Sequence, residues 1–161
     1  MNQKIKIDAI DKKISDLLIE DGRMSCSRIA ARIGEISERA VRYRIDRLIK
    51  NGVISIHGNV NAEGLGLAVF ADVFIEVEPS LVLSIAKELA AFESISYVAC
   101  STGQNDISIQ VFAQNNNELF NFVTETIAKI PGVRKTHISF VPLKIKDDHV
   151  WHIPSFCVQD S

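Results

Sequence analysis

A dense cluster of positive charge lies in the stretch SERAVRYRIDRL, residues 37–48. Four of its arginines fall within nine residues: Arg39, Arg42, Arg44 and Arg47. Guanidinium groups form paired hydrogen bonds with phosphate oxygens and with the acceptor edge of guanine, so this stretch could bind a nucleic acid. The simpler alternative is a solvated helix face, since surface helices often carry several charged residues.

The apolar residues of this stretch decide which arginines face outward. Val41, Ile45 and Leu48 recur at spacings of three and four, which predicts a helix that buries them, with Ser37 as its N-cap. Three residues then share the outer face at i, i+3 and i+4: Arg39, Arg42 and Tyr43. Arg44 lies beside the apolar stripe, where we expect it to pair with a carboxylate or a phosphate rather than to contact bases.

Two further helices are predicted upstream. Residues 7–20 carry one apolar stripe with acids and lysines opposite, and the Asp-Gly-Arg of residues 21–23 ends this helix. A shorter helix runs from about residue 25 to 33, and Gly34 ends it. The arginine-rich helix follows after a tight turn. Three short helices in this order predict a helix-turn-helix, winged-helix-like domain.

The charge distribution supports a polyanionic partner for this domain. The whole chain has a formal net charge of -2. Residues 1–62, however, hold 12 Lys and Arg against 8 Asp and Glu, a net charge of +4, whereas residues 63–161 hold 6 against 12, a net charge of -6. We therefore expect the first third of the chain to bind double-stranded DNA, with the third helix in the major groove.

The expected DNA contacts fall into two groups. Five residues at the start and outer face of the third helix are expected nearest the bases: Ser37, Glu38, Arg39, Arg42 and Tyr43. Four cations are better placed for phosphates, which position a domain without specifying sequence: Arg47, Lys50, Arg23 and Arg28. A single domain with a net charge of +4 should bind weakly, so we expect DNA binding to require a dimer.

The periodicity changes after residue 52. Strands are predicted over residues 53–60, 67–78, 94–101, 106–113 and 136–142, with helices from about residue 79 and over residues 117–129. After the first of these strands, the order β-α-β-β-α-β predicts an α+β, ferredoxin-like domain with both helices on one face of an antiparallel sheet. Phe70 and Phe74 would then be exposed on the other face. A second copy of the sheet is the simplest cover for them, which predicts a homodimer.

Composition limits the remaining classes of protein. No apolar run approaches the ~20 residues that a bilayer requires, and the N-terminal residues lack the apolar stretch of a signal peptide. Three widely spaced cysteines without a C-x-x-C motif fit reduced thiols. We therefore expect a cytoplasmic protein that does not associate with membranes and needs no cofactor.

Taken together, several segments resemble the Lrp/AsnC, or feast/famine, transcription regulators. They are residues 7–54, the Leu-Gly of residues 65–66, the TGQND of residues 102–106 and the IPGV of residues 130–133. The resemblance implies a DNA-binding domain at residues 1–52, a linker strand at 53–65 and an effector-binding, oligomerising domain at 66–142. It also implies homodimers that associate into tetramers or octamers, and an amino acid or related metabolite as effector. The turn of residues 34–37 is one residue longer than the family's Gly-Leu-Ser.

The TGQND segment has two interpretations. Turn chemistry alone explains it as a hairpin connection. The resemblance instead implies an effector pocket lined by Thr102, Gly103 and Asp106, in which the carboxylate pairs with an α-ammonium group. Gln104 and Asn105 would then select the effector's side chain.

The tail at residues 143–161 extends beyond the resemblance, and we expect it to pack on the domain or on a neighbouring subunit. Its metal-capable groups form no complete ligand motif, so we predict no metal site: Asp147, Asp148, His149, His152 and Cys157. Catalytic motifs are also absent, which argues against an enzyme. Two alternatives stay open: an architectural DNA-binding protein, and a tetrapyrrole decarboxylase-like enzyme on the same fold, for which His137 and Arg134 are the only hint.

Overall fold

The computed structural model describes residues 5–146 and 150–159. They form two compact units. The described residues up to Asn59, together with those from Ile145 onward, form unit 1, and Val60–Lys144 form unit 2. The chain therefore leaves unit 1 after Asn59 and returns to it at Ile145. Among the described residues, no helix has the length and apolar content that crossing a membrane requires.

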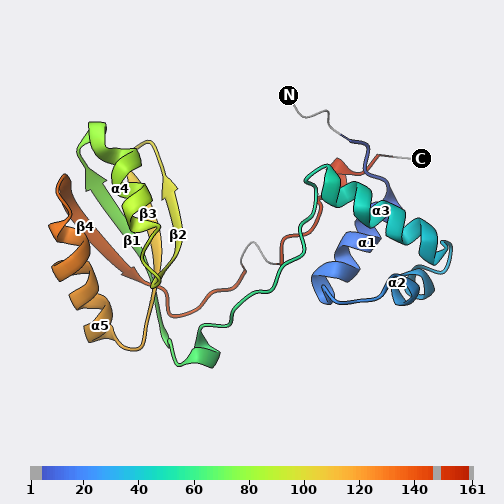
Figure 1. Ribbon diagram of the computed structural model, residues 1–161, viewed down its shortest axis with the longest axis horizontal. Helices are drawn as coiled ribbons and strands as arrows, with labels where there is room; N and C mark the ends of the chain where they lie inside the picture. The colour runs from blue at the N-terminus through green and yellow to red at the C-terminus, as the bar shows by residue number, and fades with distance from the viewer. Residues whose placement is uncertain (1–4, 147–149, 160–161) are drawn as a thin grey trace. The chain divides into compact units, whose positions relative to one another are not determined.

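Unit 1 is built from the predicted helices α1 (Ala9–Glu20), α2 (Cys26–Ile33) and α3 (Glu38–Lys50) (Figure 1). Their apolar stripes meet in one small core around the buried side chains of Ile14, Met24, Ile29 and Val41. Residues three and four apart share one face of a helix, so three short amphipathic helices can bury their stripes only against one another. The predicted helix-turn-helix domain is confirmed.

Unit 2 is a four-stranded antiparallel sheet with helices on one face (Figure 1). The strands are β1 (Val69–Val77), β2 (Ile95–Cys100), β3 (Ile107–Ala113) and β4 (Val133–Phe140), in the order β2-β3-β1-β4. The helices α4 (Val82–Leu89) and α5 (Asn116–Asn121) cover alternate, fully or nearly buried residues of the strands. This is the predicted ferredoxin-like arrangement.

The second face of this sheet carries aromatic side chains, as the alternation in β1 predicts. Phe70 of β1 pairs in register with Phe112 of β3, and their ring centroids are 4.8 Å apart. Phe74 lies beside His137 of β4, at 6.5 Å between ring centroids. Lys144 Nζ lies 4.4 Å from the centroid of the Phe70 ring.

The strand predicted over residues 53–60 is wrong, because the structure assigns no strand there. A strand requires a neighbour with which to exchange backbone hydrogen bonds. Its apolar residues Val53, Ile54 and Ile56 instead line a cavity beside α1.

The helix predicted over residues 117–129 is interrupted. After α5, the chain forms a π-helical turn at Phe122–Thr126 and then a short 3-10 turn at Ile127–Lys129. Leu119, Val123 and Ile127 are buried as their spacing of four predicts. Phe120 lies outside that stripe and is 57% exposed.

Candidate nucleic-acid interface and effector segment

The start of α3 is fixed by local chemistry. Gly34 ends α2 in the left-handed conformation, at φ 85°, which glycine adopts without strain. Ser37 then caps α3, because its hydroxyl accepts a hydrogen bond from the Ala40 N–H at 3.2 Å. Val41 and Leu48 are fully buried on the inner side. These contacts determine which side chains of α3 face the solvent.

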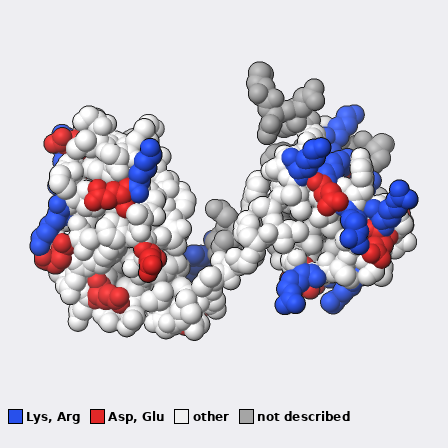
Figure 2. Space-filling view, in the orientation of Figure 1, with Lys and Arg blue, Asp and Glu red and all other residues white. Residues whose placement is uncertain are grey.

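The outer face of α3 is as exposed as its sequence predicts. Arg39, Arg42 and Tyr43 are all exposed, and Tyr43 retains 68% of its accessible surface. Arg42 Nη2 donates to Glu38 Oε1 at 3.0 Å, one turn away on the same face. Lys and Arg side chains gather over unit 1 in the space-filling view (Figure 2). Ser37 and Glu38 thus have partners within the helix, whereas Arg39 and Tyr43 project outward.

Arg44 and Arg47 reach toward the start of α1. Arg44 Nη1 lies 2.7 Å from both Asp8 Oδ2 and Asp11 Oδ1, and Arg47 Nη2 pairs with Asp11 Oδ2. The prediction that Arg44 pairs with a carboxylate is confirmed. Arg47, which we expected to contact phosphate, instead forms an ion pair with the fully buried carboxylate of Asp11. Arg47 can reach the same carboxylate as Arg44 because the two residues are three apart on α3 and therefore lie on neighbouring turns of one side of the helix.

Electrostatics favour the charged forms of Asp8 and Arg44. Burial raises the pKa of Asp8, but the Asp11 N–H and the Arg44 guanidinium outweigh this effect and lower the pKa overall. Burial lowers the pKa of Arg44, and its hydrogen bonds with Asp8 and Asp11 raise it by more. Asp8 and Asp11 also form a capping box at the start of α1.

Asp11 is the important residue that the sequence interpretation missed. We expected the acids of the first helix to lie opposite its apolar stripe. Asp11, however, is four residues after Ile7 and three before Ile14, so it lies within the stripe. A carboxylate at such a position predicts a buried cationic partner, and that signal could have identified it.

The other three expected phosphate contacts are exposed. Arg23 lies between α1 and α2, Arg28 in the first turn of α2, and Lys50 is the last residue of α3. Of the nine residues expected to contact DNA, Arg47 is the one whose side chain pairs with a buried carboxylate, that of Asp11.

The TGQND segment connects β2 to β3, as turn chemistry predicts. The Ser101 N–H donates to Asp106 O at 2.9 Å, which closes the hairpin. Asp106 Oδ2 accepts a hydrogen bond from the Val77 N–H at 2.9 Å. The bond gives the Val77 N–H an acceptor at the point where the pairing of β1 with β4 shifts register. Asp106 therefore has a structural role, while Thr102, Gly103 and Gln104 are exposed and Asn105 is half-buried.

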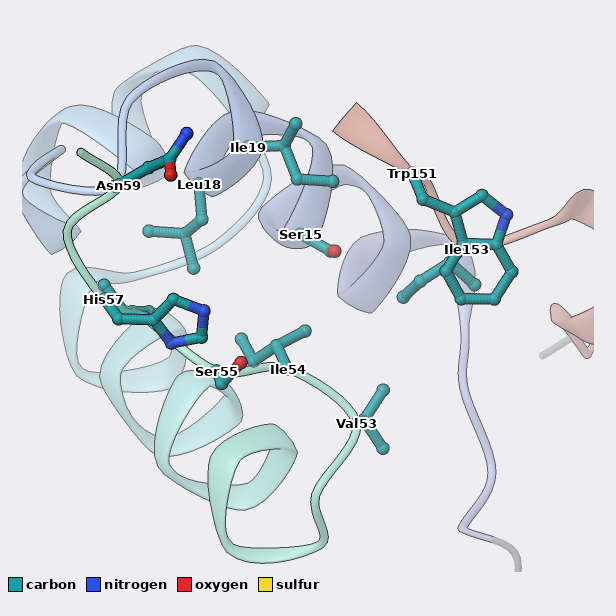
Figure 3. A pocket seen from close by; sticks show the side chains of 12 residues that line it. Ser15, Leu18, Ile19, Val53, Ile54, Ser55, His57, Asn59, Trp151 and Ile153 are labelled. Carbon is teal, nitrogen blue, oxygen red and sulfur yellow. The ribbon is translucent and has the colours of Figure 1, made fainter. Parts of the chain in front are cut away.

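The described part of the tail packs on unit 1. Trp151 and Ile153 line a cavity of about 450 Å³ beside α1, together with residues of the 53–59 segment (Figure 3). His152 Nδ1 lies 2.8 Å from Asp16 Oδ1. The sequence predicts packing on the domain or on a neighbouring subunit, and the structure groups the described tail from Ile145 onward with unit 1. Asp147, Asp148 and His149 lie outside the described residues, and the remainder shows no cluster of metal-ligating groups.

Two family models together span most of the chain. One described as "PF0864 C-terminal dimeric alpha+beta barrel domain" matches residues 64–153, and one described as "Winged helix-turn-helix DNA-binding" matches residues 7–55. An uncharacterised HTH-type transcriptional regulator, PH0140 of Pyrococcus horikoshii, is 38% identical over 87% of this chain and 89% of its own length. The transcriptional regulator LrpA of the same organism is 30% identical over 87% of this chain and 99% of its own length.

Solved structures share the fold. Escherichia coli AsnC superimposes with a TM-score of 0.79 at 20% identity, covering 89% of this chain and 97% of its own. The Neisseria meningitidis regulator NMB0573, in complex with L-Met, gives a TM-score of 0.80 at 23% identity, covering 88% and 94%. The similar sequences carry the names of transcriptional regulators and not of enzymes. The chain therefore belongs to the Lrp/AsnC family of helix-turn-helix transcription regulators.

Proposed function

We propose that this regulator binds a specific double-stranded DNA sequence as a homodimer and responds to an amino acid or a related small metabolite. The observation that carries the proposal is the division of the α3 arginines. Arg44 and Arg47 hold the helix to α1, whereas Arg39 and Arg42 are exposed to solvent. A helix fixed from behind can present rigid side chains to a groove.

The outer face of α3 suits the major groove of B-DNA. Arg39 and Arg42 can each donate two hydrogen bonds to O6 and N7 of guanine, and a bidentate pair contributes about 1–3 kcal/mol of discrimination against another base. Arg42 exchanges its solvent-exposed Glu38 partner for the base, which costs little because exposed ion pairs contribute about 0–1 kcal/mol. Arg23, Arg28 and Lys50 then contact phosphates.

Two copies are needed because one domain offers few base contacts. The second face of the unit 2 sheet carries Phe70, Phe74 and Phe112, an unusual set for a surface in contact with water. The matching family model is described as dimeric. We infer that two such faces pack together, which places two DNA-binding domains on one roughly palindromic site.

An amino-acid effector is supported by one related structure, since NMB0573 was solved with L-Met. We propose the segment of residues 102–106 as part of the effector site. Asp106 already accepts a backbone hydrogen bond through Oδ2, so an α-ammonium group would pair with its other oxygen. For regulation, the effector must bind two assemblies of the protein with different affinities.

A gel-shift titration on DNA upstream of the protein's own gene tests the DNA-binding proposal. Specific and scrambled duplexes are compared at two salt concentrations, with the Arg39→Ala/Arg42→Ala protein alongside. The matched control is Lys87→Ala/Arg134→Ala, which removes the same charge from exposed positions of unit 2. We expect sequence-dependent binding that only the α3 variant loses.

Two results would contradict the proposal. Equal binding to both duplexes with a steep loss at higher salt would indicate an architectural protein, because phosphate contacts alone carry no sequence information. Equal loss of binding in the Lys87→Ala/Arg134→Ala control would show that total charge, and not the outer face of α3, determines affinity.

A further inference from the structure

The C-terminal segment of residues 150–159, which is part of unit 1, contacts that unit's N-terminal region at two points. Val158 pairs with Ile7 in a parallel bridge, and the Gln159 N–H donates to Ile7 O at 2.8 Å. Further along, His152 Nδ1 lies 2.8 Å from Asp16 Oδ1. The segment is therefore attached just before α1 begins and again within its second half.

Apart from these two points the segment packs loosely. Phe156, between them, is 89% exposed, and Trp151, just before His152, is 63% exposed. Trp151 and Ile153 also line one side of a cavity of about 450 Å³ whose other walls are α1 and residues 53–59 (Figure 3). A segment that buries little apolar surface is held mainly by its few hydrogen bonds. Such segments open at a low free-energy cost.

The contact at Ile7 leads directly to α3. Ile7 precedes Asp8, which is the N-cap of α1 and a partner of Arg44. Asp11, in the first turn, pairs with Arg44 and Arg47. A backbone hydrogen bond that fixes Ile7 therefore limits fraying of the turn that holds α3 from behind.

We propose that residues 150–159 form a detachable clasp that positions α3 for DNA. When the clasp is docked, it holds the start of α1 and, through Asp8 and Asp11, the orientation of α3. When it is released, that turn frays and DNA affinity falls. The proposal rests on the proposed DNA contact of α3. In the chain, the clasp follows unit 2, which ends at Lys144.

Two substitutions in the full-length protein release the clasp, each with a matched control. Gln159→Pro removes the N–H that binds Ile7, while Gln159→Ala keeps it. The preceding residue, Val158, is already extended, so it accommodates the proline. His152→Ala removes the contact with Asp16, while Phe156→Ala removes a side chain that is almost fully exposed.

The measurements are hydrogen exchange of residues 5–20, followed by mass spectrometry, and fluorescence-anisotropy titration of the duplex from upstream of the gene. For Gln159→Pro and His152→Ala we expect exchange at the start of α1 to accelerate and the Kd to rise, each by about fivefold or more, as the loss of about one net hydrogen bond implies. Gln159→Ala and Phe156→Ala should match the wild type in both measurements.

Each arm has an outcome that overturns the proposal. Unchanged exchange in both releasing variants would show that the segment does not stabilise α1. Faster exchange with unchanged DNA affinity would refute the coupling to α3. The Arg39→Ala/Arg42→Ala protein separates this proposal from the proposed function, because it should lose DNA binding and retain wild-type exchange. If the wild type binds no duplex, the proposed function and the coupling both fail, and the exchange data still decide whether the clasp docks.

Discussion

Substitution of Asp11 by asparagine should destabilise unit 1 far more than its mild chemistry suggests. The Asp11 side chain has no exposed surface and accepts hydrogen bonds from Arg44, from Arg47 and from the Asp8 N–H. An amide at this position accepts through one oxygen only and turns its NH₂ group toward a guanidinium. Arg44 would keep Asp8, whereas Arg47 would lose its carboxylate.

The size of the effect follows from burial. Removing one partner of a buried ion pair typically costs about 3–5 kcal/mol. Here the side chains of Arg44 and Arg47 are 22% and 32% exposed, so water can partly replace the lost carboxylate. We expect the free energy of unfolding to fall by about 2–3 kcal/mol, which lowers the Tm of a domain of this size by roughly 10–20 °C.

Urea denaturation monitored by far-UV circular dichroism measures this change. The helical signal reports chiefly on unit 1, because α1, α2 and α3 hold most of the described α-helical residues. The matched control is Asp46→Asn on the exposed side of α3, which should shift the free energy by less than about 0.5 kcal/mol. If Asp11→Asn behaves like this control, the carboxylate does not hold α3 and the argument for a fixed recognition helix is refuted.

Three further predictions concern other parts of the fold. Gly132→Ala should lower the free energy of unfolding, measured by thermal denaturation, by about 1–3 kcal/mol, because the new Cβ would overlap the Leu81 side chain. Gly66→Ala is the control: Gly66 also has a positive φ but lies in open space, so the loss should be smaller. Because the pKa of Asp8 is lowered in the folded protein, its charged form contributes stability above pH ~4 that is lost at lower pH, and the Tm should decline there. Asp8→Asn should make this decline of Tm with falling pH shallower. An unchanged decline would exclude Asp8 as its source. Phe70→Lys should convert the proposed dimer to monomer in sedimentation velocity, and a persistent dimer would place the interface elsewhere.

The sequence alone was sufficient for the elements whose signals are local. Helix periodicity and the caps at Gly34 and Ser37 located α1–α3, and alternation in β1 identified its buried face, because both patterns depend on residues close together in the chain. The exposure of Arg39, Arg42 and Tyr43 followed from the same periodicity.

Contacts between distant residues were decided only by the tertiary structure. Arg47 and Asp11 are 36 residues apart, and nothing in the local pattern of α3 distinguishes a phosphate contact from a buried ion pair. The strand predicted at residues 53–60 failed for a related reason, since a strand exists only beside a partner. The docking of residues 150–159 on α1 joins opposite ends of the chain. Periodicity specifies which face of an element is apolar, but packing decides which other element covers it.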